Sequence, residues 1–237
     1  TGTGTSGIAL GNIMANYLSR GLDMFIEGIQ DSVRVGAEYK SSLAELSAIT
    51  GIAGEDLDNL GQTARQQAAA TGVGVNDQIE AYKLLASNID ISVIGGVEGL
   101  KMLSQETVRL SQASGVDLAT SADTVASSIN QFGYSADQTS RVVNVLAAGS
   151  KYGAAEVGQL GESLKNAGTT AGLAGLDIET TVAALEVMSQ SALKGAEAGT
   201  GLRNVLSILQ SGAADLAALG ITPATLKTEG LSSTLRL

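Results

Sequence analysis

The chain has 237 residues, of which 44% are hydrophobic and 3% aromatic, and it contains no His, Cys or Trp. Without His and Cys there is no disulfide, no thiolate nucleophile, no Ser-His-Asp triad and no zinc site made of the usual ligands. A formal net charge of −10, with Lys and Arg scattered singly, also argues against specific nucleic-acid binding.

The first predicted element is a long amphipathic helix over residues 8–46, either one helix or two joined near Gly36. Its apolar residues recur at intervals of three and four, which places them on one face. Polar residues interrupt the stretch, so it falls short of the roughly 20 apolar residues that span a bilayer. We expect the apolar face to mediate self-association or docking to a partner. The face consists of Met14, Leu18, Leu22, Phe25, Ile29 and Val33.

Short helices are predicted after this segment, separated by glycines because the chain has a single proline. Small polar or acidic residues open most of them, as expected at helix starts. Pairs of such helices form hairpins, and stacked hairpins give a compact bundle or a short solenoid. The predicted fold class is therefore all-α: a long N-terminal helix followed by stacked short helices or helical hairpins with Gly-rich turns. The predicted ranges are 55–70, 76–88, 97–113, 117–132, 135–148, 154–167, 177–191, 197–210 and 213–219.

Local signals refine the connections between these helices. Residues 89–94 alternate as a strand would, but no second strand is predicted to pair with them, so a loop carrying its isoleucines into the core is favoured. Ser135 and Gln138 have the spacing of a capping box. Thr222 and Pro223 are typical of an N-cap followed by proline in the first helical position.

Two sequences match catalytic or binding motifs but lack their context. Residues 2–7 match G-x-G-x-x-G, yet no strand precedes them, and a linker is the simpler interpretation. Ser191 and Lys194 match S-x-x-K, but the companion motifs of the serine acyl-transfer enzymes are missing. Acidic groups such as Glu55 and Asp58 lie in predicted first turns, where helix capping explains them. We therefore expect no catalytic residue, cofactor or metal.

Glycines four residues apart recur along the chain. In a membrane this spacing would indicate helix dimerisation, but here we expect most of these glycines to lie in loops, where they allow left-handed turns and close approach of a helix to a loop. The pairs are Gly7 and Gly11, Gly149 and Gly153, Gly168 and Gly172, and Gly195 and Gly199.

A family resemblance rests on several segments in order. Residues 48–51 (Ala-Ile-Thr-Gly), 130–133 (Asn-Gln-Phe-Gly) and 142–155 resemble the core region of phage tail tape measure proteins, and the agreement extends over residues 38–210. The sharpest match is the segment 194–206, which resembles the family's Lys-Gly, Glu-Ala-Gly-Thr and Leu-Arg signature. The signature residues are Lys194, Gly195, Glu197, Ala198, Gly199, Thr200, Leu202 and Arg203.

The resemblance implies a structural protein of the virion tail, in the tail lumen or at the tip, and in the host cytoplasm during assembly. Such a protein sets tail length, takes part in tail-tip assembly and is released during DNA ejection. The implied partners are the tail tube, the tail-tip or baseplate hub and tail assembly chaperones. Tape measure proteins are much longer and carry coiled coils, and this chain lacks an initiator Met, so we expect it to be part of a longer protein.

Three segments are expected: residues 1–35 with the long helix, 36–212 as the helical core, and 213–237 as the start of a following segment. Two other classes stay open at this point. One is a generic helical interaction domain of another secreted or particle-associated protein. The other is a cell-wall hydrolase segment, although seven aromatic residues and no His make a sugar cleft or a metal site difficult to build.

Overall fold

A computed structural model describes residues 34–212, 214–218 and 220–234. The chain divides into two compact units, residues 1–44 and 45–237. In the first unit, residues 34–44 are helical, and Arg34 pairs with Glu38 at 3.0 Å. The apolar stripe expected between Met14 and Val33 lies outside the described residues, and so does the glycine-rich segment of residues 2–7. The expected divisions after residues 35 and 212 remain predictions.

The second unit is built from helices, and its described residues contain no strand, which confirms the all-α prediction. After a helical segment over residues 45–50, the elements run in chain order. They are α2 (Glu55–Thr71), α3 (Val75–Asn88), α4 (Gly96–Ser114), α5 (Leu118–Phe132), the 3-10 turn η1 (Ala136–Gln138), α6 (Thr139–Tyr152), α7 (Val157–Leu173), α8 (Ile178–Gln190), α9 (Gly195–Gln210), α10 (Ala214–Ala218) and α11 (Pro223–Thr234).

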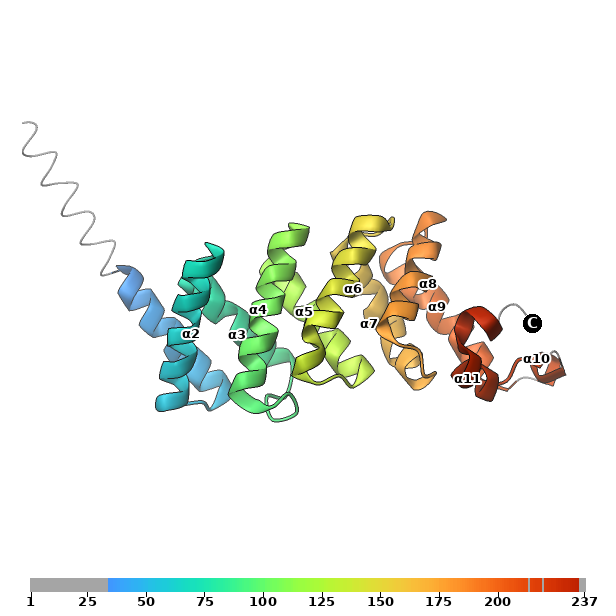
Figure 1. Ribbon diagram of the computed structural model, residues 1–237, viewed down its shortest axis with the longest axis horizontal. Helices are drawn as coiled ribbons and strands as arrows, with labels where there is room; N and C mark the ends of the chain where they lie inside the picture. The colour runs from blue at the N-terminus through green and yellow to red at the C-terminus, as the bar shows by residue number, and fades with distance from the viewer. Residues whose placement is uncertain (1–33, 213, 219, 235–237) are drawn as a thin grey trace, which may run out of the picture. The chain divides into compact units, whose positions relative to one another are not determined.

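Within this unit the helices form stacked hairpins in two layers (Figure 1). The helices α2, α4, α6 and α8 lie side by side in one layer, and α3, α5, α7 and α9 lie side by side in the other. Each helix also packs on the next one along the chain, so every hairpin except the terminal ones is buried between two neighbours.

The hairpins repeat at a nearly constant interval. Leu100, Thr139 and Ile178 occupy the same buried position in α4, α6 and α8, and they follow one another at 39 residues. In the other layer, Ala122 of α5 and Gly161 of α7 are also 39 residues apart and are both buried. The interval between the first two hairpins is longer, and the loop of residues 89–95 lies within it.

That loop is the segment whose alternation suggested either a strand or a loop. It contains no strand, so the loop interpretation is confirmed. Ile89 and Ile94 are buried with only 5% and 3% of their surface exposed, whereas Ile91, the third isoleucine expected in the core, is half-buried. The two predicted caps are also confirmed. Ser135 forms a capping box with Gln138, and the Thr222 hydroxyl accepts the Thr225 N–H ahead of Pro223.

Candidate functional site

The signature segment lies at the start of α9, facing α7. Its small and apolar residues point inward, where Gly195, Ala198, Gly199 and Leu202 are buried. Lys194, Glu197 and Arg203 are exposed, and Thr200 is half-buried. The structure thus brings half of the signature together as a helix-packing surface and leaves its charged members on the outside.

Glycine makes this packing close. A Cβ on Gly199 would lie 2.8 Å from the Cα of Ser163 in α7, so only glycine lets the two backbones approach in this way. The Ser163 hydroxyl donates to the carbonyl of Gly195 at 2.6 Å, which fixes the start of α9 on the middle of α7. Gly195 itself has a φ of +57° and faces the Glu162 carboxylate.

The same kind of contact joins α7 to α5. A Cβ on Gly168 would meet the amide group of Gln131, and a Cβ on Gly172 would lie 2.8 Å from the Gln131 carbonyl oxygen. Gly161 faces Thr124 in the same way. The expectation that the spaced glycines lie mostly in loops is therefore wrong for the described pairs, because five of these six glycines lie inside helices and only Gly153 lies in a turn. We call the glycine-mediated contacts of α5, α7 and α9 the glycine spine.

A second cluster holds the turn between α6 and α7. Glu186 of α8 is buried, and its Oε2 accepts the backbone N–H groups of Ala154 at 2.6 Å and Ala155 at 3.2 Å. Lys194 of the signature donates to the carbonyl of Ala154. Gly153 leaves the space that the Glu186 carboxylate occupies. The hairpin of α8 and α9 thus binds both the amides and a carbonyl of this turn.

Glu186 was missed by the sequence analysis. Its position in the sequence could have indicated a buried carboxylate, because it lies on the same face of α8 as Val182, Leu185 and Ser189. A carboxylate on such a face needs polar partners. Its Oε1 has no hydrogen-bond partner among the described residues. Lys194, for its part, bonds to a backbone carbonyl of a neighbouring turn, and the S-x-x-K spacing with Ser191 marks the end of α8, where Ser191 is the C-cap.

A third cluster joins the loop after α5 to the start of α8. Arg141 of α6 binds Glu179 with two hydrogen bonds, at 2.6 and 2.7 Å, and lies 5.4 Å from the Tyr134 ring. The Tyr134 hydroxyl accepts the Ile178 N–H at 3.2 Å. The bond from Arg141 lowers the pKa of Glu179, and the hydrogen bond from the Thr180 hydroxyl, with a smaller contribution from Arg141, lowers that of Asp177. The acids at this helix start therefore serve capping and pairing.

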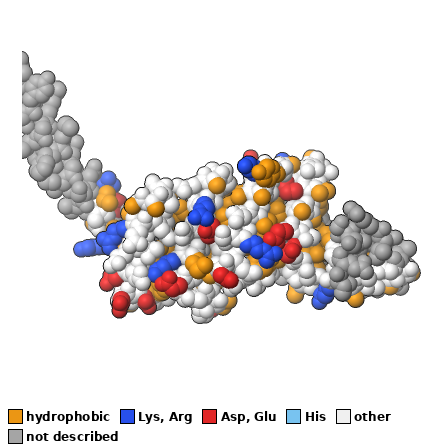
Figure 2. Space-filling view, viewed as in Figure 1, with side chains coloured by type: hydrophobic (Ala, Val, Ile, Leu, Met, Phe, Trp, Pro, Cys, Tyr) orange, Lys and Arg blue, Asp and Glu red, His pale blue; other side chains and the backbone are white. Residues whose placement is uncertain are grey.

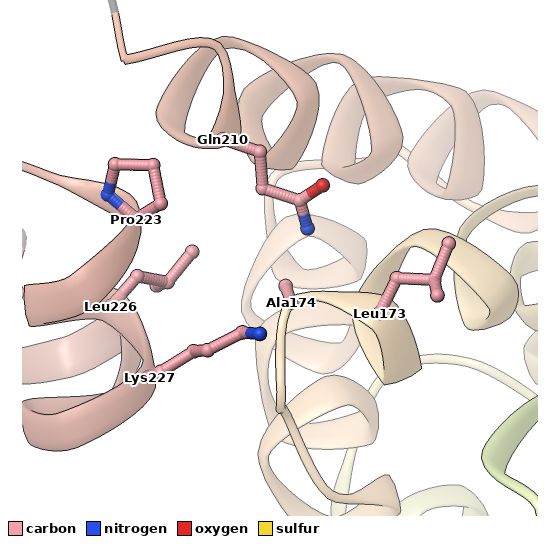
Figure 3. A pocket seen from close by; sticks show the side chains of 6 residues that line it. All are labelled: Leu173, Ala174, Gln210, Pro223, Leu226 and Lys227. Atoms are coloured by element: carbon pink, nitrogen blue, oxygen red, sulfur yellow. The ribbon is translucent and has the colours of Figure 1, made fainter.

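Cavities open at several places among the described residues. One, of about 180 Å³, lies between the ends of α7 and α9 and the helix α11, and Lys227 extends into it beside Ala174 (Figure 3). A larger one, of about 540 Å³, lies where α4 and α6 end and α7 begins. No group of three or more acidic side chains that could hold a metal gathers among the described residues. In the same part of the chain, no helix is long and apolar enough to cross a bilayer.

Together, the stacked hairpins and the glycine spine define an all-α helical stack whose polar clusters hold its own turns and helix starts. The model of the phage-related minor tail protein family matches residues 61–236, and the chain belongs to this family. It is 30% identical over 181 residues to the tape measure protein of Pneumococcus phage Dp-1, covering 74% of this chain. It is 26% identical over 211 residues to the probable tape measure protein of Escherichia phage P2, covering 87% of this chain.

These matches confirm the resemblance to tape measure proteins. They also limit what the chain represents, because the matched part is 15% of the Dp-1 protein and 25% of the P2 protein. No solved structure matches the chain.

Proposed function

We propose that this chain is a folded, non-catalytic module of a phage tail tape measure protein. The whole protein sets tail length, takes part in tail-tip assembly and leaves the tail when DNA is ejected; the module serves assembly rather than measurement. Its proposed partners are the tail tube, the tail-tip or baseplate hub and the tail assembly chaperones, within the tail lumen or tip and in the host cytoplasm before that. Family membership and the two tape measure relatives support this role.

The main support for the proposal is that the chain reverses direction in every hairpin, so that it advances little along the stack. A straight helix extends about 1.5 Å per residue, so the 39 residues of one repeat would reach about 60 Å. Stacked helices are separated by only about 8–10 Å, and one hairpin therefore adds a sixth of that length or less. A chain folded in this way contributes little length per residue to a tail, but it presents a compact surface to which assembly partners can bind.

Deleting one repeat from the full-length protein tests the distinction. Removing residues 139–177 joins Gln138 directly to Ile178. Ile178 is the residue equivalent to Thr139 in the next repeat, so α8 takes the place of α6 and the remaining hairpins can stack as before. We expect the tails that form to keep the wild-type length to within about 10 Å in electron micrographs. A matched deletion of 39 residues from a coiled-coil region of the same protein should shorten them by about 60 Å. If the hairpin deletion shortens tails by that amount as well, the module is part of the ruler and the proposal is wrong.

Association is proposed for the N-terminal stripe of Met14, Leu18, Leu22, Phe25, Ile29 and Val33. Supporting it, residues 34–38, which follow the stripe, are all exposed, including Val35 with half of its surface. Replacing Leu18, Leu22 and Phe25 by Glu should reduce the oligomeric mass measured by light scattering and block tail assembly. The same change at the off-stripe positions Asn16, Ser19 and Gln30 should do neither. Unchanged mass and assembly in the stripe variant would contradict the proposed association.

The non-catalytic part of the proposal has its own test. On the described face, Lys and Arg side chains lie beside Asp and Glu without a broad band of either sign (Figure 2). Glu186, which is buried, accepts hydrogen bonds from two backbone amides. We expect no peptidoglycan release by the purified chain. Release that disappears in a single carboxylate variant, such as Glu186→Gln, would establish the hydrolase alternative.

A further inference from the structure

The cavity of about 540 Å³ is a groove between neighbouring hairpins. It opens where α4 and α6 end and the first turn of α7 begins. Small side chains form most of its walls, and one cation lies at its edge. The lining residues are Ala113, Ser114, Ala147, Ser150, Lys151 and Val157.

The repeat explains why space is left there. Val108, Ala147 and Glu186 occupy the same position in α4, α6 and α8, each 39 residues after the last. Val108 fills its site with 2% of its surface exposed, and Glu186 reaches across to the turn after α6. Ala147 ends at its Cβ, so the place that a carboxylate fills in the next repeat stays open in this one.

The edge of the groove carries a cation and an aromatic ring. Lys151 is exposed, its Nζ lies 5.1 Å from the Tyr152 ring, and no described carboxylate forms an ion pair with it. Tyr152 is 78% exposed, which is unusual for a ring in a chain with so few aromatics. An ammonium group without a carboxylate partner among the described residues, beside a groove with small walls, suits a narrow, negatively charged chain segment.

We propose that this groove binds an acidic peptide segment of a partner protein. A Glu or Asp side chain of the segment enters the place that Ala147 leaves open and pairs with the Lys151 ammonium group, as Glu186 does with backbone amides one repeat later. The Tyr152 ring covers the apolar neighbours of that acid. The groove has one cation, Lys151, which matches a single carboxylate but not the row of phosphates of a nucleic acid or an anionic membrane. This inference does not depend on the role proposed for the whole protein.

A peptide taken from the chain itself is a suitable probe. The sequence of residues 182–190, acetylated and amidated, contains one carboxylate, that of Glu186, between small and apolar residues. We expect saturable binding to the full chain by fluorescence anisotropy. Binding should weaken about fivefold for the Glu186→Gln peptide and for the chain carrying Lys151→Ala, as for a partly exposed ion pair, and it should fall with added salt. A carbodiimide should couple the peptide carboxylate to the Lys151 amine as an amide, which mass spectrometry locates.

Position 147 provides the matched variants. Ala147→Glu places a carboxylate inside the groove and should abolish peptide binding, whereas Ala147→Ser leaves the space and should preserve it. Circular dichroism checks that both variants keep their helices. Absence of saturable binding to the wild-type chain, equal affinity of the Lys151→Ala chain, or coupling mainly to Lys101 or Lys165 would each overturn the proposal.

Discussion

The helix α4 and its successors in the same layer, α6 and α8, have cores of different polarity at equivalent positions. In α4, Ser104 and Thr107 are fully buried, and their hydroxyls have no hydrogen-bond partner among the described residues. At the equivalent places, α6 has Val143 and Leu146, and α8 has Val182 and Leu185. Since an unpaired buried polar group opposes folding, these two positions are less stabilised in α4 than in α6 and α8.

The facing helix α3 also buries unpaired polar groups. Gln78 and Tyr82 of α3 are buried, and each has a polar oxygen without a partner among the described residues. Burial, with a smaller contribution from Glu98, raises the pKa of Tyr82. The glycine spine, in contrast, brings α5, α7 and α9 together at backbone distance. We infer that local opening begins in α3 and α4 and reaches α7 and α9 last.

The largest effect is expected at the glycine spine. Gly199→Val would place side-chain atoms against the backbone of Ser163, and the free energy of unfolding in urea should fall by about 3 kcal/mol or more. Gly201→Ala is the matched control, because its Cβ meets only the terminal methyl group of Met188, and it should be neutral or stabilising. Equal losses from both variants would show that the close approach of α7 and α9 is not what stabilises these helices.

The next effect concerns the turn between α6 and α7. Glu186→Ala removes the acceptor for the Ala154 and Ala155 amides and should cost about 2 kcal/mol of unfolding free energy. Glu186→Gln keeps one acceptor oxygen and should cost about half as much. Val187→Ala, at the neighbouring exposed position, serves as the control. A stable Glu186→Ala variant would mean that water replaces the carboxylate in the turn.

A polar-to-apolar exchange tests the difference between α4 and α6 directly. Thr107→Val keeps the shape and removes an unpaired buried hydroxyl, so it should stabilise the chain by about 1 kcal/mol. The reverse change at the equivalent position, Leu146→Thr, should destabilise it by about 2 kcal/mol. In the Thr107→Val variant, the amides of α3 and α4 should exchange their hydrogens more slowly than in the wild-type chain. Loss of stability in Thr107→Val would indicate that buried water satisfies the hydroxyl.

The smallest effect is expected at the Arg141 cluster, whose side chains are partly exposed. The pKa values of Asp177 and Glu179 are lowered in the folded chain, so their contribution to stability is present above the ordinary values of 3.8 and 4.5 and is lost as pH falls below them. Arg141→Ala should therefore lower the midpoint of thermal unfolding slightly at pH 7, and the difference from wild type should shrink below pH 4. A difference that persists at low pH would assign the effect to the Tyr134 contact.

The sequence predicts the helices better than it predicts their ends. The segments opened by Asp117 and Asp177 begin where expected, because both aspartates cap a helix by accepting an N–H three residues later. The helix α7, expected over residues 154–167, instead begins at Val157 and continues to Leu173. Its glycines 168 and 172 suggested termination, but they lie against Gln131 of α5, a contact that single-chain periodicity does not contain.

The candidate site shows the same limit. The signature residues could be found from their order in the chain, and their burial follows from helical spacing. Their partners could not, because Ser163 of α7 and Ala154 of the turn after α6 reach the signature only in the folded chain, and Glu186 of α8 in turn holds Ala154. The repeat of 39 residues is not predicted from the sequence, since equivalent positions share burial rather than residue type.

The two layers also differ in how they would respond to force. The layer of α5, α7 and α9 is in contact at the backbone and has little room to compress or slide. The layer of α4 and α6 contains an open groove and is joined there by small side chains. Bending the stack would therefore change the width of the groove between α4 and α6. The distances between α5, α7 and α9 would stay the same, because their backbones are already in contact.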